Sequence, residues 1–558
     1  MLGADVLRVA PRPSNPITVA AAALQRVLRG RAAWWCLPIC LGIVLIVPLF
    51  LVDIPPLTDY PNHLAREFVL AYGAHDPVIS RMYATHWGII PNLAIDVAMP
   101  ALAQIVPLYL AGKIILAVTL LLPVAGAAAY HRAVFGYRSL WPLASGLVAY
   151  NGLFLLGFLN FQISLGLAML GAAAWVRWRD RRPLLLAVLG AVWSSVIFFA
   201  HVFGLLFLAA IIGGWEFQRL LNLRRDGKAI WPQLAGSAAR VTAVFALPCG
   251  LCLLAPIAAR GGGMVWRPLL DRLLWLLLPF FSYTIVSGVL AGAAILALLY
   301  VLARHRMFGL APGAVFTMTP LLAAYMVSPF VANGTGFVGE RLPIMLGFML
   351  FAAGRPMRLS SAARVATVGL LTAAFALKMT TICEIWYDHN SDLAEMRRVI
   401  APVPAGSRVI AVSVYAADNP AYWQSMQPGR VIPALFPTYI HLPALLLMEH
   451  RAFWPLLFTA RGKQPLTLRP PYDRLDGHQG EPPDYHVLQH PISTKEAAVA
   501  PYLAQWQTDF DYVLLLNAGG ARDLPNYVPD RLRLVTHGDV AALFRIVPGA
   551  PSATAATR

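Results

Sequence analysis

The feature that most limits the fold of this chain is a succession of apolar stretches, each long enough to cross a bilayer. A membrane-spanning helix needs about 20 largely apolar residues, and by that rule about eleven stretches qualify. They cover residues 34–53, 112–131, 140–158, 161–176, 183–199, 201–217, 241–258, 281–302, 311–329, 342–354 and 364–383. Because backbone polar groups in hydrocarbon must be hydrogen-bonded within the protein, these stretches predict an all-α polytopic membrane domain.

The composition agrees with a membrane setting. Hydrophobic residues make up 58% of the chain and charged residues 13%, whereas about 25% of a soluble domain is charged. The net charge of +17 comes from 44 Lys and Arg against 27 Asp and Glu. Much of this excess lies in short loops between apolar stretches, where it sets the orientation in the membrane. We therefore expect membrane lipids, and not nucleic acid, around this protein.

The basic loops alternate along the chain, which predicts the topology. Basic residues gather in the arm before residue 34, near Arg132 and Arg138, in 177–182, in 219–228, in 303–306 and in 355–364. Loops of this kind stay in the cytoplasm. The N-terminus is then cytoplasmic, the intervening loop 52–96 faces outward, and an odd number of spans places residues 384–558 outside. We expect a multi-pass protein of the cell inner (plasma) membrane.

The composition changes after Cys383, where charges and prolines become frequent. Three runs have the apolar, β-branched character of strands, at 408–414, 511–517 and 541–547. The segment 493–507 has a helical pattern that opens with a capping-box spacing of Ser and Glu, and the Pro-, Gly- and His-rich stretch 463–490 indicates a long loop. The chain therefore divides into a membrane domain, 1–383, and a small extracytoplasmic α/β soluble domain, 384–558.

The outward loop 52–96 carries five of the 27 acids of the chain. If Asp59 opens a helix, then Asp59, His63 and Arg66 fall on one face at i, i+4 and i+7, together with Glu67. The opposite face is apolar and consists of Leu64, Ala65, Phe68, Val69 and Tyr72. A helix with two such faces lies in the membrane interface with its charged side toward water. It would present acid and base groups where a membrane-embedded substrate surfaces.

The layout of the whole chain resembles the GT-C type of integral membrane glycosyltransferases, such as the protein O-mannosyltransferases and the aminoarabinose transferases. The segment "PPLTDYPNHLAR" (55–66) carries the resemblance, because it is similar to the acidic motif in the first outer loop of these enzymes. Two more distant matches are "GFLNFQISLGLAML" (157–170) and "GERLP" (339–343). The resemblance implies transfer of a sugar from a polyprenyl-phosphate carrier to an extracytoplasmic acceptor, which is a glycan, a lipid or a protein. Many members have an Asp-Glu pair where Asp59 is followed by Tyr60 here, so a divalent metal is an open question.

Asp59 is the candidate general base. An inverting transfer needs one carboxylate to take the proton of the acceptor while the phosphate leaves from the opposite face of the sugar. The structural alternative is that Asp59 caps the helix that Pro61 begins, and the two roles are compatible. His63 is the second catalytic candidate, and Arg66 could bind the lipid phosphate through its planar fork. A solvated helix face explains His63 and Arg66 equally well.

The other substrate-binding candidates come from three outer turns. Asp96 is either a second polar group of the site or the N-cap of the next helix. Asn160 could bind sugar hydroxyls or satisfy its own turn. Glu340 and Arg341 close the outer loop before residues 342–354, where the arginine could stabilise the departing phosphate or anchor the interface. His201 interrupts an apolar run, and a neutral histidine bonded to a neighbouring helix explains it.

Two alternatives to an enzyme stay open: a transporter or flippase of a lipid-linked glycan, and a non-catalytic membrane assembly or sensor protein. Ion-coupled carriers place acids near the middle of the bilayer. The acids of residues 1–383 lie instead in loops or at span edges, which favours chemistry at the outer interface. No cofactor other than a possible divalent metal is expected, and the histidines of the 463–490 stretch, which are His478, His486 and His490, lack the paired spacing of metal ligands.

Overall fold

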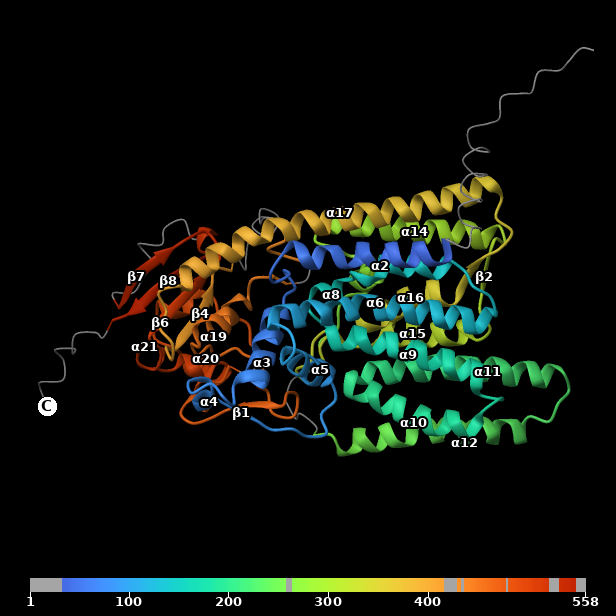
Figure 1. The fold of residues 1–558 in the computed structure, drawn as a ribbon, viewed down its shortest axis with the longest axis horizontal. Helices are drawn as coiled ribbons and strands as arrows, with labels where there is room; N and C mark the ends of the chain where they lie inside the picture. The colour runs from blue at the N-terminus through green and yellow to red at the C-terminus, as the bar shows by residue number, and fades with distance from the viewer. Residues whose placement is uncertain are drawn as a thin grey trace, which may run out of the picture.

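The computed structural model describes residues 33–256, 263–415, 429–432, 436–477, 480–520 and 531–547. Within these residues, eight helices are long and apolar enough to cross a membrane. They are α2 (Ala33–Leu51), α6 (Leu108–Phe135), α9 (Leu159–Trp178), α10 (Pro183–Ala200), α11 (Val202–Arg225), α12 (Trp231–Leu254), α14 (Ile285–Arg304) and α17 (Ser361–Ile400). They run side by side in one bundle (Figure 1). The prediction of a polytopic helical domain followed by a small strand-containing part is confirmed.

Two further predicted spans form helices that are shorter than a bilayer crossing requires. α15 (Ala314–Val327) has 14 residues and α16 (Arg341–Ala352) has 12, against the roughly 20 that a span needs. Both pack against longer helices, α15 on α11 and α16 on α6. α16 is almost wholly buried, so the apolar character of this segment reflects packing inside the protein.

The predicted span 140–158 is wrong, because this segment is broken into three short helices. They are η1 (Trp141–Ser145), α7 (Gly146–Ala149) and α8 (Gly152–Leu155). The break lies at Asn151, whose side-chain oxygen accepts hydrogen bonds from the backbone N–H groups of Leu153 and Phe154 and so starts a new helix. Gly157 then turns the chain at φ +95°, a conformation that favours glycine. The segment is apolar because it lies in the protein core.

The segment after α2 and the C-terminal part of the chain gather at one end of the bundle (Figure 1). The first contributes α3 (Tyr60–Tyr72), α4 (Ile79–Met82), β1 (Tyr83–Thr85) and α5 (Ala94–Ala103). The turn between α11 and α12 lies at the opposite end, as does β2 (Phe308–Leu310), which pairs with β3 (Gly354–Pro356). Predicted outer and inner segments are thus at opposite ends, and which end faces the cytoplasm stays a prediction.

Cysteine labelling tests this orientation. In a variant without the five native cysteines, Ala74→Cys and Ala504→Cys should react in intact cells with a membrane-impermeant maleimide, because both positions are exposed at the predicted outer end. Lys228→Cys, exposed beyond α11, should react only after the membrane is opened. Labelling of Lys228→Cys in sealed cells would reverse the topology.

The C-terminal part is built on a four-stranded sheet with the order β4-β6-β8-β7. β4 (Val409–Ser413) and β6 (Tyr512–Leu516) are parallel, and β8 (Ala541–Ile546) pairs antiparallel with β6 and with β7 (Leu532–His537). The three predicted strands are therefore confirmed, and β7 was not predicted.

The helix predicted at 493–507 is divided into α20 (Thr494–Val499), η6 (Pro501–Leu503) and α21 (Trp506–Asp509), because Pro501 cannot continue the helical hydrogen bonding. The predicted capping box is present: the Ser493 hydroxyl accepts from the Glu496 N–H, and the Glu496 carboxylate accepts from the Ser493 N–H.

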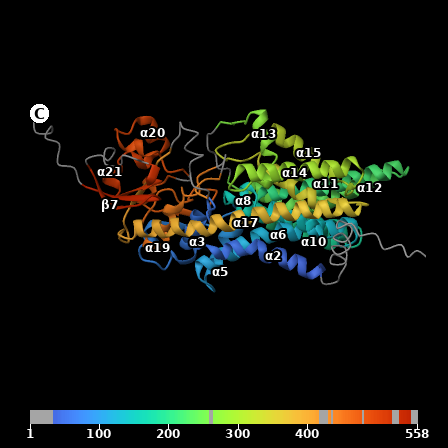
Figure 2. The ribbon, with the colours of Figure 1, turned by 90° about the horizontal axis from the view of Figure 1, so that it is seen from above.

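Two connections fix the C-terminal part on the bundle. α17 has 40 residues, about 60 Å at 1.5 Å per residue, and continues from the bundle to the sheet (Figure 2). The predicted domain boundary at residue 383 falls inside this helix. β5 (Leu466–Leu468), within the stretch expected to be a loop, pairs antiparallel with β1.

The remaining elements are α13 (Leu269–Trp275), η2 (Leu278–Phe280), η3 (Leu442–Ala444), α19 (Leu445–His450), η4 (Tyr472–Leu475), η5 (Tyr485–Leu488) and η7 (Ala518–Gly520).

Candidate active site

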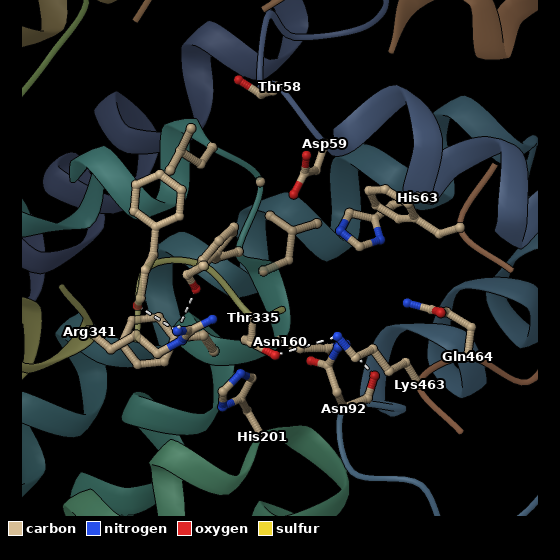
Figure 3. A pocket seen from close by; sticks show the side chains of 18 of the residues that line it. Thr58, Asp59, His63, Asn92, Asn160, His201, Thr335, Arg341, Lys463 and Gln464 are labelled. Atoms are coloured by element: carbon tan, nitrogen blue, oxygen red, sulfur yellow. Dashed lines mark hydrogen bonds between the residues drawn. The ribbon is translucent and has the colours of Figure 1, made fainter. Parts of the chain in front are cut away.

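A cavity of about 510 Å³ lies where the helical bundle meets the C-terminal part (Figure 3). Its walls come from the start of α3, the loop before α5, the α8–α9 connection, the α10–α11 junction, the loop before α16 and C-terminal segments between residues 436 and 481. The polar and charged side chains that line it are Thr58, Asp59, His63, Asn92, Asn160, His201, Thr335, Arg341, His441, Lys463, Gln464 and Glu481. The site therefore combines the helical bundle with the C-terminal part of the chain.

The backbone before α3 is fixed by the α8–α9 connection. The Asp59 N–H donates to the Leu156 carbonyl at 3.0 Å, and the Thr58 N–H donates to the Leu155 carbonyl at 3.1 Å. At Gly157 a Cβ atom would lie 2.9 Å from the Cβ of Asp59, so only glycine allows this approach. Asp59 stands at the N-cap position of α3, but its side chain makes no capping hydrogen bond. Its carboxylate points into the cavity (Figure 3).

Two histidines lie beside this carboxylate. His441 Nε2 is 3.4 Å from Asp59 Oδ1, and His63, one helical turn after Asp59, lines the same cavity edge-on to the ring of Phe458. Burial lowers the pKa of His63 well below its usual value, and the positive charge of Arg66 lowers it further, although a backbone contact with Gly157 opposes both. His63 is therefore neutral at neutral pH.

Arg341, the first residue of α16, lies on another wall of the cavity. Its Nη1 donates to the carbonyls of Gly336, at 3.1 Å, and Phe337, and its guanidinium lies 5.1 Å from the ring of Phe158 and 5.0 Å from that of Phe203. Arg341 is only 5% exposed. Among the described residues its Nε has no hydrogen-bond partner, and no carboxylate lies within salt-bridge distance. Since no carboxylate is in direct contact with it, this buried guanidinium can accept an anion as a partner.

Arg66 and Asp96, both predicted to bind substrate, do not line the cavity. Arg66 donates to Asp96 Oδ1 at 2.7 Å and to Glu67 Oε1 at 3.2 Å, and all three residues are at most 2% exposed. The expectation that this face of the helix meets water is wrong for Arg66 and Glu67, which are buried where α5, η3 and α19 pack against α3. The three residues form a buried ion cluster.

Two other predicted residues also have structural partners. Glu340 Oε1 accepts from Arg267 Nε at 3.1 Å and lies outside the cavity lining. Asn160 lines the cavity, but its Oδ1 accepts from the Ile95 N–H at 3.0 Å and its Nδ2 donates to the Asn92 carbonyl at 2.7 Å. The side chain of Asn160 thus satisfies neighbouring backbone groups.

No lining residue of the C-terminal part was predicted from the sequence. His441, Lys463, Gln464 and Glu481 belong to segments far from Asp59 in the sequence, and no local pattern connects them with it. Lys463 Nζ donates to Thr335 Oγ1 at 3.4 Å, in the loop whose Gly336 and Phe337 carbonyls accept from Arg341. The only signal was the unusual composition of 463–490, which begins at Lys463.

A bound metal ion would need several ligand side chains close together. The described residues contain no group of three or more His, Cys, Asp and Glu side chains arranged to hold a metal ion. His486 is paired with Asp484, and His478 lies outside the described residues.

No family model matches the chain, and no curated protein matches it. Among solved structures, it is similar to ArnT from Cupriavidus metallidurans bound to undecaprenyl phosphate, with 12% identity and a TM-score of 0.49, over 95% of this chain and 100% of that chain. The apo state of ArnT gives 11% identity and a TM-score of 0.49, over 92% and 98% of the two chains.

Proposed function

We propose that this protein is an inverting membrane glycosyltransferase of the GT-C type, which moves a sugar from a polyprenyl-phosphate carrier to an extracytoplasmic acceptor. The observation that carries the proposal is the placement of the Asp59 carboxylate and the Arg341 guanidinium on different walls of one cavity (Figure 3). The first supplies a base, and the second a binding site for a phosphate. The acidic motif around Asp59, with its resemblance to GT-C enzymes, also supports it.

The reaction can be written with these two groups. The acceptor oxygen attacks the anomeric carbon of the sugar, and its proton passes to the carboxylate of Asp59. The bond between the anomeric carbon and the phosphate oxygen breaks on the opposite side, so the configuration is inverted. The phosphate leaves with an additional negative charge, which the guanidinium of Arg341 stabilises. No metal is required by this scheme.

The location of the cavity suits a lipid-linked donor. It lies at one end of the apolar bundle, so a polyprenyl chain can stay in the membrane while its phosphate reaches Arg341. We propose that residues 1–383 form the membrane domain and that residues 384–558 form an extracytoplasmic domain that closes the site. The protein would then act at the outer face of the inner (plasma) membrane.

A release assay tests the proposed function. Purified protein in detergent is mixed with a panel of polyprenyl-phosphate sugars, labelled in the lipid phosphate, together with an extract of envelope glycans and lipids as acceptor. We expect release of free polyprenyl phosphate from at least one donor. A flippase or an assembly protein leaves every donor intact, and that result across the panel would reject the enzyme.

Arg341→Lys should impair use of the donor, because lysine keeps the charge but cannot donate two parallel hydrogen bonds to a phosphate. Loss of one charge-assisted hydrogen bond costs about 1.5–3 kcal/mol, so we expect turnover at limiting donor to fall by about 10- to 100-fold. Arg398→Lys, which changes an exposed arginine of α17, is the matched control and should retain turnover. If Arg341→Lys is equally active at limiting donor, Arg341 only anchors the interface.

A further inference from the structure

The orientation of the Asn62 amide in α3 is fixed from both sides. Its Oδ1 accepts from the Phe458 N–H at 2.9 Å, and its Nδ2 donates to the Leu456 carbonyl at 2.8 Å. The same Nδ2 lies 3.2 Å from Nδ1 of His441. An amide nitrogen can only donate, so Nδ1 of His441 has to be the acceptor. In the neutral ring the proton then resides on Nε2.

This proton faces the proposed base. Nε2 of His441 lies 3.4 Å from Asp59 Oδ1, which is long for a hydrogen bond, as catalytic contacts commonly are before substrate binds. The ring cannot easily turn away. It is 4% exposed and packs edge-on against Trp454, with the ring centroids 5.9 Å apart, and against Phe458, at 5.3 Å.

We propose that His441 is the positioning residue of Asp59, an inference that rests on the proposed function. As a neutral donor, His441 binds Oδ1 of Asp59 and directs Oδ2 toward the acceptor hydroxyl. The acceptor proton ends on Asp59 Oδ2, and His441 keeps its own proton throughout. His441 is no proton relay, because a proton on Nδ1 would face the amide N–H group of Asn62.

Three substitutions separate this role from simple packing. His441→Gln places an amide nitrogen near the position of Nε2 and so keeps a donor to Asp59. His441→Asn is shorter and loses this donor, and His441→Met fills the space without any donor. His450→Asn is the matched control, because His450 at the end of α19 lies outside the cavity lining and contacts the Val403 carbonyl.

The readouts are kcat in the release assay and equilibrium binding of ³²P-labelled polyprenyl phosphate to the purified full-length variants. We expect His441→Asn and His441→Met to lose about 10- to 100-fold in kcat, the effect of one hydrogen bond to a charged group, with lipid phosphate binding within about twofold of wild type. His441→Gln should recover most of this loss, and His450→Asn should match wild type.

The inference is overturned if a folded Asn or Met variant keeps the wild-type kcat, or if Gln is as impaired as Met. One of the Asn and Met variants suffices for this comparison, should the other fail to fold. Failure of the proposed function gives a different result, because the wild-type protein itself then releases no polyprenyl phosphate.

Discussion

Asp59→Asn is expected to lower glycosyl transfer by about 10²- to 10⁴-fold, the usual contribution of a general base. The variant should still fold and insert. Asparagine has the same shape, the Asp59 side chain makes no capping hydrogen bond, and the contact that fixes this position, from the Asp59 N–H to the Leu156 carbonyl, is a backbone one. The measurement is the turnover number of the purified variant at saturating donor.

Asp53→Asn is the control for this experiment. Asp53 lies at the same end of the bundle, but its side chain is 57% exposed and pairs with Arg397 outside the cavity lining. Such surface ion pairs contribute little, so turnover should stay close to wild type. Near-normal transfer by Asp59→Asn would show that another group takes the acceptor proton.

The second large effect is expected for stability at the buried ion cluster of Arg66, Glu67 and Asp96. Arg66→Met keeps the volume of the side chain but leaves two buried carboxylates without their cation. Removal of one partner of a buried ion pair costs about 3–5 kcal/mol. We therefore expect a large fall in the thermal unfolding midpoint of the detergent-solubilised variant. Arg81→Met, at an exposed arginine of α4, should change the midpoint little.

The loss of stability caused by Arg66→Met should also depend on pH. Burial raises the pKa of Glu67 well above its usual value, as does the neighbouring Asp96, and burial likewise raises the pKa of Asp96, while Arg66 opposes these shifts. Without Arg66 both carboxyl groups favour the protonated form when folded. Stability is then retained at low pH and lost as pH rises through the raised pKa values. The deficit should be larger at pH 8 than at pH 5, and an equal deficit at both would contradict this explanation.

Hydropathy predicted those parts of the fold that depend on composition alone. The eight long helices follow from apolar stretches of span length, and three of the four strands of the C-terminal sheet follow from apolar runs. The segment 140–158 was misinterpreted because burial inside a helical bundle and burial in lipid select the same residues. The break at Asn151 comes from one side-chain capping interaction, a weak signal within a long apolar run.

Four of the residues predicted from the sequence line the cavity, namely Asp59, His63, Asn160 and Arg341. Asp59 and His63 share a helix face, and both line the cavity. Arg66 continues that face, but the residues that cover it come from α5 and the C-terminal part, which no pattern within α3 reveals. His441 comes close to Asp59 only through tertiary packing. A single histidine in "TYIHLPA" gives no local signal of such a contact.

The most direct test of the proposed transfer is the anomeric configuration of its product. Purified protein receives a polyprenyl-phosphate sugar of one known anomer, together with the acceptor fraction that supports release, and the anomeric proton coupling of the isolated product is measured by NMR. One carboxylate acting opposite the departing phosphate predicts complete inversion. A product with retained configuration would contradict direct transfer with Asp59 as the base, and the absence of any product would contradict the glycosyltransferase itself.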